Sequence, residues 1–252
     1  MDLSKPTRLL LCGGGDMPSS ALELFGSWAG GAEARVLVIA WASRFPEEAF
    51  ERTAIALCEQ GGAARADASL APPRTRAARA AFLAALDRAT GVFFTGGDQK
   101  RIMDGLDDRL ARRLRDTFDG GVAFGGTSAG TAIMSPLMIA GTRDPRRHDS
   151  SCVVVRPGLG FLPGTIVDQH FFRRRRHNRL FSLLLENERV HGIGIDEGAA
   201  LAVTGGRGRV LGGQVLEAWA IEGELTVRIH GPEHEIPVGV SAVGTRRALE
   251  VS

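Results

Sequence analysis

Short apolar stretches alternate with longer segments of helical periodicity along this chain, and that alternation limits the folds it can adopt. Residues 8–12 and 35–40 are predicted strands, whereas residues 46–59 and 75–88 carry apolar side chains at helical spacing. Strands that alternate with helices predict an α/β fold, with a mostly parallel sheet and helices on both of its faces. Further strands are predicted at residues 91–95, 122–125, 153–156, 165–167, 192–195, 200–204, 214–220 and 225–229, and further helices at 107–118 and 176–187.

The last third of the chain is predicted to be rich in strands, with turns at Gly205-Gly206 and Gly212-Gly213. We expect these strands to lie at the edge of the sheet or to form a small β-appendage. A chain of 252 residues is at the upper end of a single α/β domain. The prediction is therefore one domain over residues 1–252.

The composition excludes several classes of protein. Hydrophobic residues make up 44% of the chain and charged residues 24%, so neither disorder nor a coiled coil is expected. A net charge of +2 is too small and too evenly spread to indicate a nucleic-acid partner. The one local basic cluster, residues 173–176 with Arg179, suits a small anionic group better than a long phosphate backbone.

Cysteine usage and hydropathy favour a protein of a reducing compartment. Cys12, Cys58 and Cys152 are far apart and odd in number, which fits neither a disulfide framework nor a metal site. We expect no metal and no cofactor. The apolar run at residues 9–12 is too short for the core of a signal peptide, and no stretch is long enough to span a membrane. We therefore expect a cytoplasmic protein without a membrane partner.

The strongest chemical motif is Gly126-Thr127-Ser128-Ala129-Gly130, between a predicted strand and a plausible helix start at residues 131–134. This is the strand–turn–helix context of a nucleophile elbow, in which a serine is raised above the edge of the sheet. A glycine-rich turn of this kind can also cradle a phosphate, but no lysine lies in or after it, which argues against a P-loop. Ser128 is the candidate nucleophile.

A nucleophilic serine needs a base and an acid that orients the base. Of six histidines, His170 is the best candidate because it follows the predicted strand at residues 165–167, at the end of the sheet where ligands bind. Asp196 and Glu197 end another strand, and one of the two is expected to face the histidine. The order serine, histidine, acid differs from that of an α/β-hydrolase, which weakens that interpretation.

Four ordered motifs together resemble the cyanophycinase family of serine peptidases. They are residues 94–99 (Phe-Thr-Gly-Gly-Asp-Gln), residues 126–130, residues 168–171 with the arginines that follow, and residues 192–197. The resemblance covers residues ~8 to ~220, and such a set is far more specific than one elbow. It implies a flavodoxin-like sheet related to class I glutamine amidotransferases, and a homodimer.

The resemblance also implies functional residues and a substrate. It implies a triad of Ser128, His170 and Glu197, where Glu197 rather than Asp196 is the family's choice. It implies that six residues line the substrate pocket: Gln99, Asp168, Gln169, Arg174, Arg176 and Arg179. The family's substrate is cyanophycin, a poly-aspartate with arginine on each β-carboxyl, and its product is the β-aspartyl-arginine dipeptide.

The pocket arginines fit this chemistry, because guanidinium groups bind a free α-carboxylate through two parallel hydrogen bonds. Arg173 and Arg175 are expected to be solvated. The oxyanion of the acyl-transfer step would be bound by the N–H of Ala129 and by one from Gly97 or Asp98. These are the groups that an exopeptidase with a serine nucleophile requires.

Three alternatives stay open from the sequence. An aspartyl or isoaspartyl dipeptidase would share the triad but act on short peptides. An esterase would prefer short acyl esters, and a non-catalytic protein would bind anionic peptides through the same arginines. Two departures from the family pattern bear on the choice between polymer and short peptide: residues 13–18 lack the expected acidic pair, and Asn178 replaces a small residue.

Overall fold

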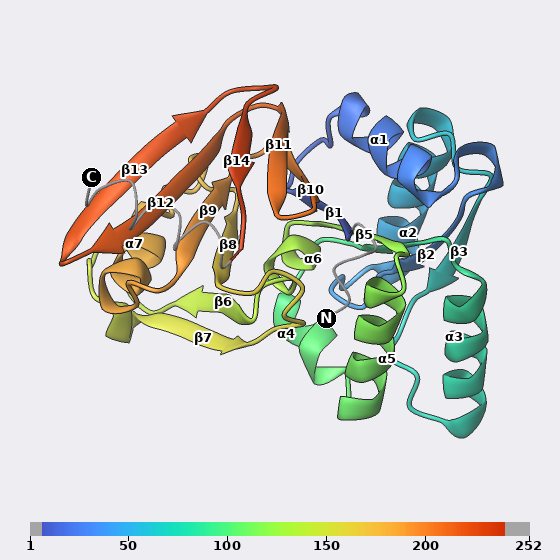
Figure 1. Ribbon diagram of the computed structural model, residues 1–252. Helices are drawn as coiled ribbons and strands as arrows, with labels where there is room; N and C mark the ends of the chain where they lie inside the picture. Colours follow the sequence, from blue (N-terminus) through green and yellow to red (C-terminus); the bar gives the residue numbers. More distant parts are fainter. Residues whose placement is uncertain (1–6, 240–252) are drawn as a thin grey trace.

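A central sheet organises the molecule in the computed structural model, which describes residues 7–239. Its parallel part is formed by five strands in the order β3-β2-β4-β5-β1 (Figure 1). They are β1 (Arg8–Cys12), β2 (Arg35–Ile39), β3 (Arg65–Ser69), β4 (Gly91–Phe94) and β5 (Ala123–Thr127). Beyond β1 the sheet continues antiparallel with β10 (Ala199–Thr204), β11 (Arg207–Gly212) and β14 (Glu235–Pro237).

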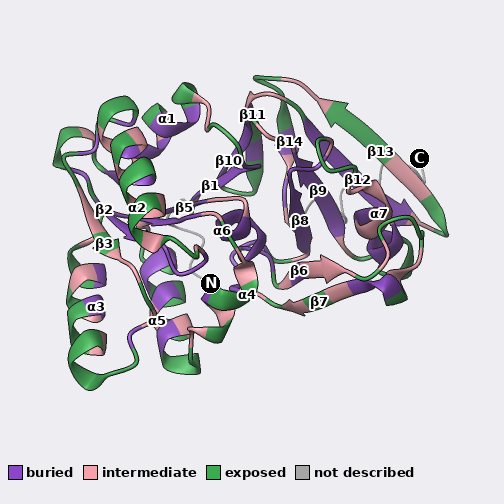
Figure 2. Ribbon diagram, turned by 180° about the vertical axis from the view of Figure 1, so that it is seen from behind, coloured by how far each residue is buried: buried purple, intermediate pink, exposed green. Residues whose placement is uncertain are grey.

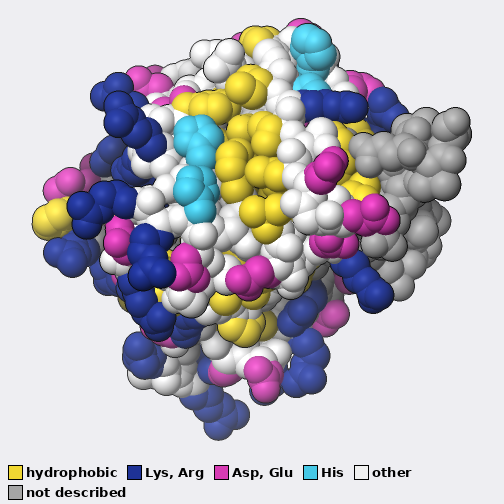
Figure 3. Space-filling view, turned by 90° about the vertical axis from the view of Figure 1, so that its left-hand side faces the viewer, with side chains coloured by type: hydrophobic (Ala, Val, Ile, Leu, Met, Phe, Trp, Pro, Cys, Tyr) yellow, Lys and Arg dark blue, Asp and Glu magenta, His cyan; other side chains and the backbone are white. Residues whose placement is uncertain are grey.

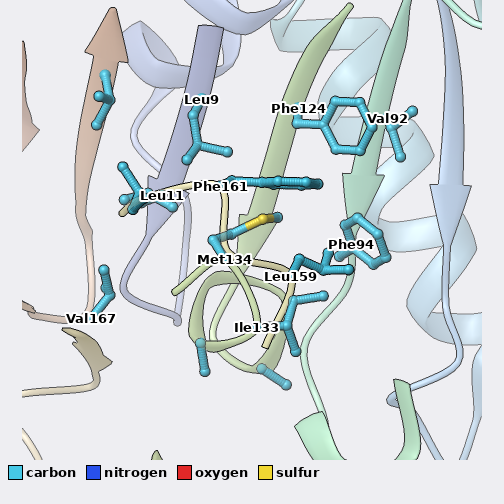
Figure 4. Close-up of a cluster of buried hydrophobic side chains, with 14 of the residues drawn as sticks. Leu9, Leu11, Val92, Phe94, Phe124, Ile133, Met134, Leu159, Phe161 and Val167 are labelled. Atoms are coloured by element: carbon cyan, nitrogen blue, oxygen red, sulfur yellow. The ribbon is translucent and has the colours of Figure 1, made fainter. Parts of the chain in front are cut away.

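Alternation along the buried strands divides their side chains between two hydrophobic layers. Leu9 and Leu11 of β1 face one layer, whereas Leu10 faces the other. The first layer is shown in Figure 4, where Leu9, Leu11, Phe124 and Phe161 surround Met134. Strands covered on both faces need continuous apolar runs, which is why the sequence signal of β1, β2 and β4 is strong.

Helices cover both faces of the sheet. On one face lie α1 (Ser19–Ala29) and α2 (Pro46–Ile55), and α2 continues into a π-helical turn at Ala56–Gln60. On the other face lie α3 (Arg76–Arg88), α4 (Gln99–Asp104) and α5 (Asp108–Asp119). Thr75 and Asp107 cap α3 and α5 by accepting hydrogen bonds from the N–H groups of Ala78 and Leu110. The amphipathic stripes predicted for α3 and α5 therefore lie against the sheet. In α2 the partly buried Phe50 packs on it, whereas Ile55 is exposed.

The strands of a second sheet alternate along the chain with the last strands of the first. The second sheet has the order β13-β12-β9-β8, in which β8 (Thr165–Gln169) and β9 (His191–Ile195) are parallel, and β12 (Val215–Ile221) and β13 (Glu224–His230) are antiparallel. Helix α7 (His177–Glu186) packs on it through Leu180 and Leu184. A hairpin of β6 (Leu137–Thr142) and β7 (Val153–Pro157) lies beside β8.

The two sheets share one hydrophobic cluster, because Val167 of β8 and Val215 of β12 pack in the same layer as Leu11. Figure 2 shows the inner strands of both sheets buried, whereas the edge strand β13 and the outer sides of the helices are exposed. Figure 3 views the side of the molecule that carries α7 and β13, and hydrophobic side chains gather on it. Leu185 of α7 and Val227 and Ile229 of β13 are exposed. The shared cluster supports one domain, which stays a prediction for residues 1–252, because 1–6 and 240–252 lie outside the described residues.

The predicted fold class is confirmed: a mostly parallel sheet with helices on both faces and a β-rich C-terminal edge. Some elements have no counterpart in the prediction, namely β3, β6, β11, β14, α1 and α4. Strand β3 is an edge strand without a buried residue, and α1 begins without a side-chain cap, so neither has a strong local signal. The helix expected to start at residues 131–134 is the single turn α6 (Ala129–Ala132).

No helix within residues 7–239 is long and apolar enough to cross a bilayer.

Candidate active site

The carboxyl ends of β1, β5 and β4 bring three loops together at one edge of the sheet. The N–H of Ser128, after β5, donates to the carbonyl oxygen of Cys12 at the end of β1, at 3.0 Å. Gly96, after β4, is so close that a Cβ placed on it would lie 3.5 Å from the Cβ of Ser128. Parallel strands direct their loops to one edge, which is where open α/β sheets bind ligands.

Ser128 occupies a strained turn. Its φ of 52° and ψ of −109° lie in a region that non-glycine residues rarely adopt, and β5 passes directly into α6 there. The turn closes because its flanking glycines allow close backbone contact: a Cβ on Gly130 would lie 2.2 Å from the carbonyl oxygen of Phe94. The Thr131 hydroxyl contacts the carbonyl oxygens of Cys12 and Gly126 at 2.7 and 2.8 Å. The strained serine of a nucleophile elbow is thus present.

His170 lies between the serine and a carboxylate. Its Nε2 is 2.7 Å from Ser128 Oγ, and its Nδ1 is 2.6 Å from Glu197 Oε1. The residue follows β8 directly, has a φ of 50° and is 7% exposed, and its N–H donates to the carbonyl oxygen of Gly13 at 2.8 Å. In the tautomer that suits both partners, Nδ1–H donates to Glu197 and Nε2 accepts the hydroxyl proton of Ser128.

Burial of the imidazole lowers the pKa of His170, and the hydrogen bond from its ring to Glu197 opposes that effect. The neutral form, which can accept a proton, is therefore favoured. The same hydrogen bond is the main cause that lowers the pKa of Glu197, and nearby positive charges on Arg173 and Arg174 act in the same direction. The pair combines a neutral base with an ionised acid, as general-base chemistry requires.

The two candidate acids have different partners. Glu197 bonds to the imidazole, whereas Asp196 Oδ1 accepts the backbone N–H of Arg173 at 2.9 Å. Asp196 therefore holds the loop that follows His170. The local sequence did not decide which of these two carboxylates faces His170. In the structure it is Glu197 that lies beside the imidazole.

The candidate oxyanion donors differ in their availability. Within residues 7–239, the N–H groups of Ala129 and Gly97 donate to no described acceptor, whereas that of Asp98 donates to the carbonyl oxygen of Ala42 at 3.0 Å. Asp98 is thus the helix cap of α4, and its side chain accepts the N–H of Lys100. Asp98 is a poor oxyanion donor on this geometry, and of the two donors considered after β4, Gly97 is the one that fits.

Four of the six predicted pocket residues form one buried network. Asp168 is 1% exposed and accepts two hydrogen bonds from Arg179, one of them from Nε at 2.6 Å. Arg176 Nη1 lies 3.4 Å from Asp168 Oδ1, and it donates to the backbone and side-chain oxygens of Gln169 at 2.7 and 2.5 Å. Asp168 is placed to hold the two guanidinium groups rather than to face a ligand directly.

Burial lowers the pKa of Arg176 to about 10, and the attraction of Asp168 partly offsets this effect. Two guanidinium groups share one carboxylate, so the network carries an unbalanced positive charge. An anionic ligand group would balance that charge.

The remaining two predicted pocket residues, Gln99 and Arg174, make hydrogen bonds outside this network. Gln99 begins α4, and its Nε2 donates to the carbonyl oxygen of Ile139 in β6 at 2.8 Å, which ties the β6–β7 hairpin to the site. Arg174 is exposed, and its N–H donates to the carbonyl oxygen of His170 at 3.0 Å. Arg173 and Arg175 are exposed as expected.

The loop after β1 has more contacts with the site than sequence reasoning assigned to it. Gly13 accepts the N–H of His170, and Gly14 accepts the N–H of Gly198 at 3.1 Å. The run of three glycines after a buried strand was the available signal, because such a run permits close backbone approach. Among the described residues, no group of three or more histidine, cysteine, aspartate or glutamate side chains could hold a metal ion.

A serine, an imidazole and a carboxylate linked in this order, on a mostly parallel sheet, are the arrangement of a serine hydrolase. The model of Peptidase family S51 matches residues 9–211, and the chain belongs to that family.

Similar proteins agree with this assignment. A cyanophycinase of Synechococcus elongatus is 39% identical over 194 residues, which are 76% of this chain and 60% of that protein. A cyanophycinase of Trichormus variabilis is 35% identical over 196 residues, 76% of this chain and 65% of that protein. The chain thus spans 60 to 65% of the length of these curated relatives.

Solved structures share the fold. A peptidase from an acI-B1 Actinobacterium matches with a TM-score of 0.67 and 21% identity, over 91% of this chain and 96% of that one. A structure from Listeria monocytogenes EGD-e matches with a TM-score of 0.57 and 15% identity, over 90% of this chain and 100% of that one. At these identities the likeness extends to the fold alone.

Proposed function

We propose that the protein is a serine-type exopeptidase that hydrolyses cyanophycin to β-aspartyl-arginine dipeptides. The observation that carries the proposal is the hydrogen-bonded chain from Ser128 through His170 to Glu197. The relatives named cyanophycinase support the choice of substrate.

In the proposed reaction, Ser128 Oγ attacks the main-chain α-carbonyl carbon of an aspartyl residue while His170 Nε2 takes the hydroxyl proton. Cleavage of the backbone amide leaves arginine on the β-carboxyl, as the dipeptide product requires. His170 then gives that proton to the leaving amine as the amide bond breaks, which leaves an acyl ester on Ser128. A water molecule, deprotonated by His170, cleaves the ester and restores the serine. Glu197 stabilises the imidazolium in both halves of the reaction. The N–H groups of Ala129 and Gly97 would bind the oxyanion.

The buried arginine network supports a substrate with a carboxylate near the scissile bond. Arg176 and Arg179 share the single charge of Asp168, so an incoming carboxylate would complete the charge balance. In cyanophycin the aspartyl α-carboxyl is part of the backbone amide, but the arginine joined to each β-carboxyl keeps its own free α-carboxylate. The network therefore favours a substrate that carries such a carboxylate over simple esters.

The first test is incubation of the purified protein with cyanophycin and, separately, with β-aspartyl-arginine, with products followed by mass spectrometry. We expect dipeptide from the polymer, and we expect the dipeptide itself to stay intact.

The second test is a variant of the assigned nucleophile. Ser128→Ala should lower turnover by about 10⁴- to 10⁶-fold. Ser27→Ala, at an exposed position of α1, is the matched control and should leave turnover unchanged. Full activity of Ser128→Ala would refute the assigned nucleophile.

One observation favours a second candidate, an isoaspartyl dipeptidase with the same triad. Asn178, which replaces the family's small residue, donates through Nδ2 to the carbonyl oxygen of Pro145 at 3.0 Å. This contact ties the loop at residues 143–149 to the first turn of α7, beside Arg176 and Arg179. Inert polymer together with cleavage of the dipeptide would select this candidate.

The homodimer and the cytoplasmic location stay predictions drawn from the resemblance and the sequence. Light scattering on the purified protein tests the first: a mass of twice 26.8 kDa is expected. A mass of one chain at all concentrations would exclude the dimer.

A further inference from the structure

The glycine loop after β1 contacts both the base and the acid of the proposed triad. Gly13 accepts the backbone N–H of His170 at 2.8 Å, and Gly14 accepts the N–H of Gly198 at 3.1 Å. A Cβ on Gly15 would lie 3.3 Å from the Cβ of Glu197. The loop therefore spans the His170–Glu197 pair from one end to the other.

Of the three glycines, Gly14 comes closest to the imidazole of His170. A Cβ placed on it would lie 2.2 Å from Cε1, 2.5 Å from Nε2 and 2.8 Å from Nδ1 of His170, and real Cβ atoms essentially never come within 3.0 Å of another heavy atom. Its φ of 111° is also one that favours glycine. The imidazole thus rests directly against the bare Cα of Gly14.

The ring has little freedom to move away from an added methyl group. Both of its nitrogens are engaged, at 2.7 Å to Ser128 and at 2.6 Å to Glu197, and His170 is 7% exposed. A displacement of about 1 Å in a catalytic group can cost about 100-fold in rate. Any displacement that relieves contact with residue 14 would lengthen one of these two hydrogen bonds.

We propose that Gly14 is a positioning residue of the triad, because its missing side chain lets the imidazole of His170 reach Ser128 and Glu197 at the same time. This inference rests on the proposed function, since it assigns Gly14 a role in orienting the base. Gly14 touches neither the scissile bond nor the nucleophile in this role and acts through His170.

The test compares Gly14→Ala with Gly30→Ala. Gly30 has the same φ of 111°, but a Cβ there would meet nothing nearer than 3.8 Å, so the control carries the backbone strain without the contact. We expect Gly14→Ala to lower kcat on the β-aspartyl substrate about 100-fold or more, with KM within about threefold. Gly30→Ala should keep kcat within about twofold. Equal effects of the two variants would overturn the proposal.

A double variant separates positioning from general damage. Because Gly14 acts through His170, Gly14→Ala should add no further loss of kcat to His170→Ala, whereas independent effects would multiply.

Thermal unfolding gives a second comparison of the double variant with His170→Ala. It can be made even if Gly14→Ala alone does not fold. Removal of the ring makes room for the methyl group, so the double variant should unfold at a temperature close to that of His170→Ala. A double variant that fails to fold, or a multiplied loss of kcat, would overturn the proposal.

A fluorophosphonate probe distinguishes failure of this inference from failure of the proposed function. Its reaction with Ser128 needs an activated serine but no particular substrate. If the unaltered protein is not labelled, the proposed hydrolase function fails. If it is labelled and Gly14→Ala is labelled equally fast, the positioning role of Gly14 fails while the hydrolase function stands.

Discussion

Among the described residues, three histidine–glutamate contacts form two groups, each around one glutamate, and the groups differ in what else takes part. In one, His170 links Glu197 to Ser128 at the edge of the parallel sheet, and the Glu197 side chain is 32% exposed. In the other, Glu217 is 1% exposed and joins His191 at 3.0 Å to His230 at 2.9 Å, within the second sheet. A histidine–carboxylate pair is thus a candidate catalytic group when a strained serine completes it, and part of a buried polar network when a second histidine does.

The largest effect that separates the two groups is expected at Glu197. Glu197→Gln keeps the size of the side chain but removes the charge that stabilises an imidazolium, so kcat should fall on the order of 10⁴-fold. The Tm should change little, because the side chain is partly exposed. Asp196→Asn, one residue away, retains an acceptor for the N–H of Arg173 and should leave kcat within a few-fold. Similar losses in both variants would contradict the distinction.

The reverse pattern is expected at Glu217. Glu217→Ala leaves His191 and His230 without their shared acceptor, and loss of a buried partner costs about 1–3 kcal/mol in the free energy of unfolding. Denaturant unfolding measures this change. The folded fraction should keep kcat within about threefold of the unaltered protein. A loss of kcat comparable to that of Glu197→Gln would make the second group part of the active site.

The buried carboxylate of Asp168 extends the comparison to binding. Arg179→Lys replaces a planar two-point contact with Asp168 by a single point charge, which should disturb the carboxylate pocket. We expect KM for the β-aspartyl substrate to rise about tenfold, the equivalent of about 1.4 kcal/mol, with a smaller change in kcat. Arg175→Lys, at an exposed position of the turn before α7, is the matched control. An unchanged KM would remove Arg179 from the pocket.

The smallest expected effect is a shift in pH dependence. Burial lowers the pKa of His170, so the neutral base persists below the ordinary histidine value of about 6.5, and the acid limb of kcat/KM should lie below that pH. The hydrogen bond to Glu197 raises the pKa of His170, so Glu197→Gln should move the limb to still lower pH. A limb that moves to higher pH in this variant would contradict the assigned direction.

The sequence was informative where burial leaves a strong local pattern. The limits of β1 were predicted without error, and β2 and β4 to within a residue, because strands covered on both faces are continuously apolar. The elbow at Ser128 and the histidine after β8 could be predicted because both follow strands directly. Helices α3 and α5 were predicted from their apolar stripes, and Thr75 and Asp107 cap them.

What could not be predicted depends on contacts between distant segments. The division of the strands into two large sheets follows from pairing, such as β12 with β9, that no local pattern encodes. The local sequence did not decide between Asp196 and Glu197, and Glu197 was expected from the resemblance alone, because the position of His170 depends on another strand. The amide of Asp98 was considered a donor, and its contact with Ala42, fifty-six residues earlier, was not visible in the sequence. The contact of Gly14 with the imidazole is of the same kind.

The distribution of the three residues over the sheets has a consequence for synthesis of the protein. Ser128 follows a strand of the first sheet, His170 follows a strand of the second, and Glu197 lies where the chain passes from β9 back to β10. A growing chain that has exposed its serine has not yet made the residues that activate it. Under the proposed mechanism, Ser128 therefore gains its base and its acid only when the second sheet has formed and docked, so the unfinished chain would have no peptidase activity.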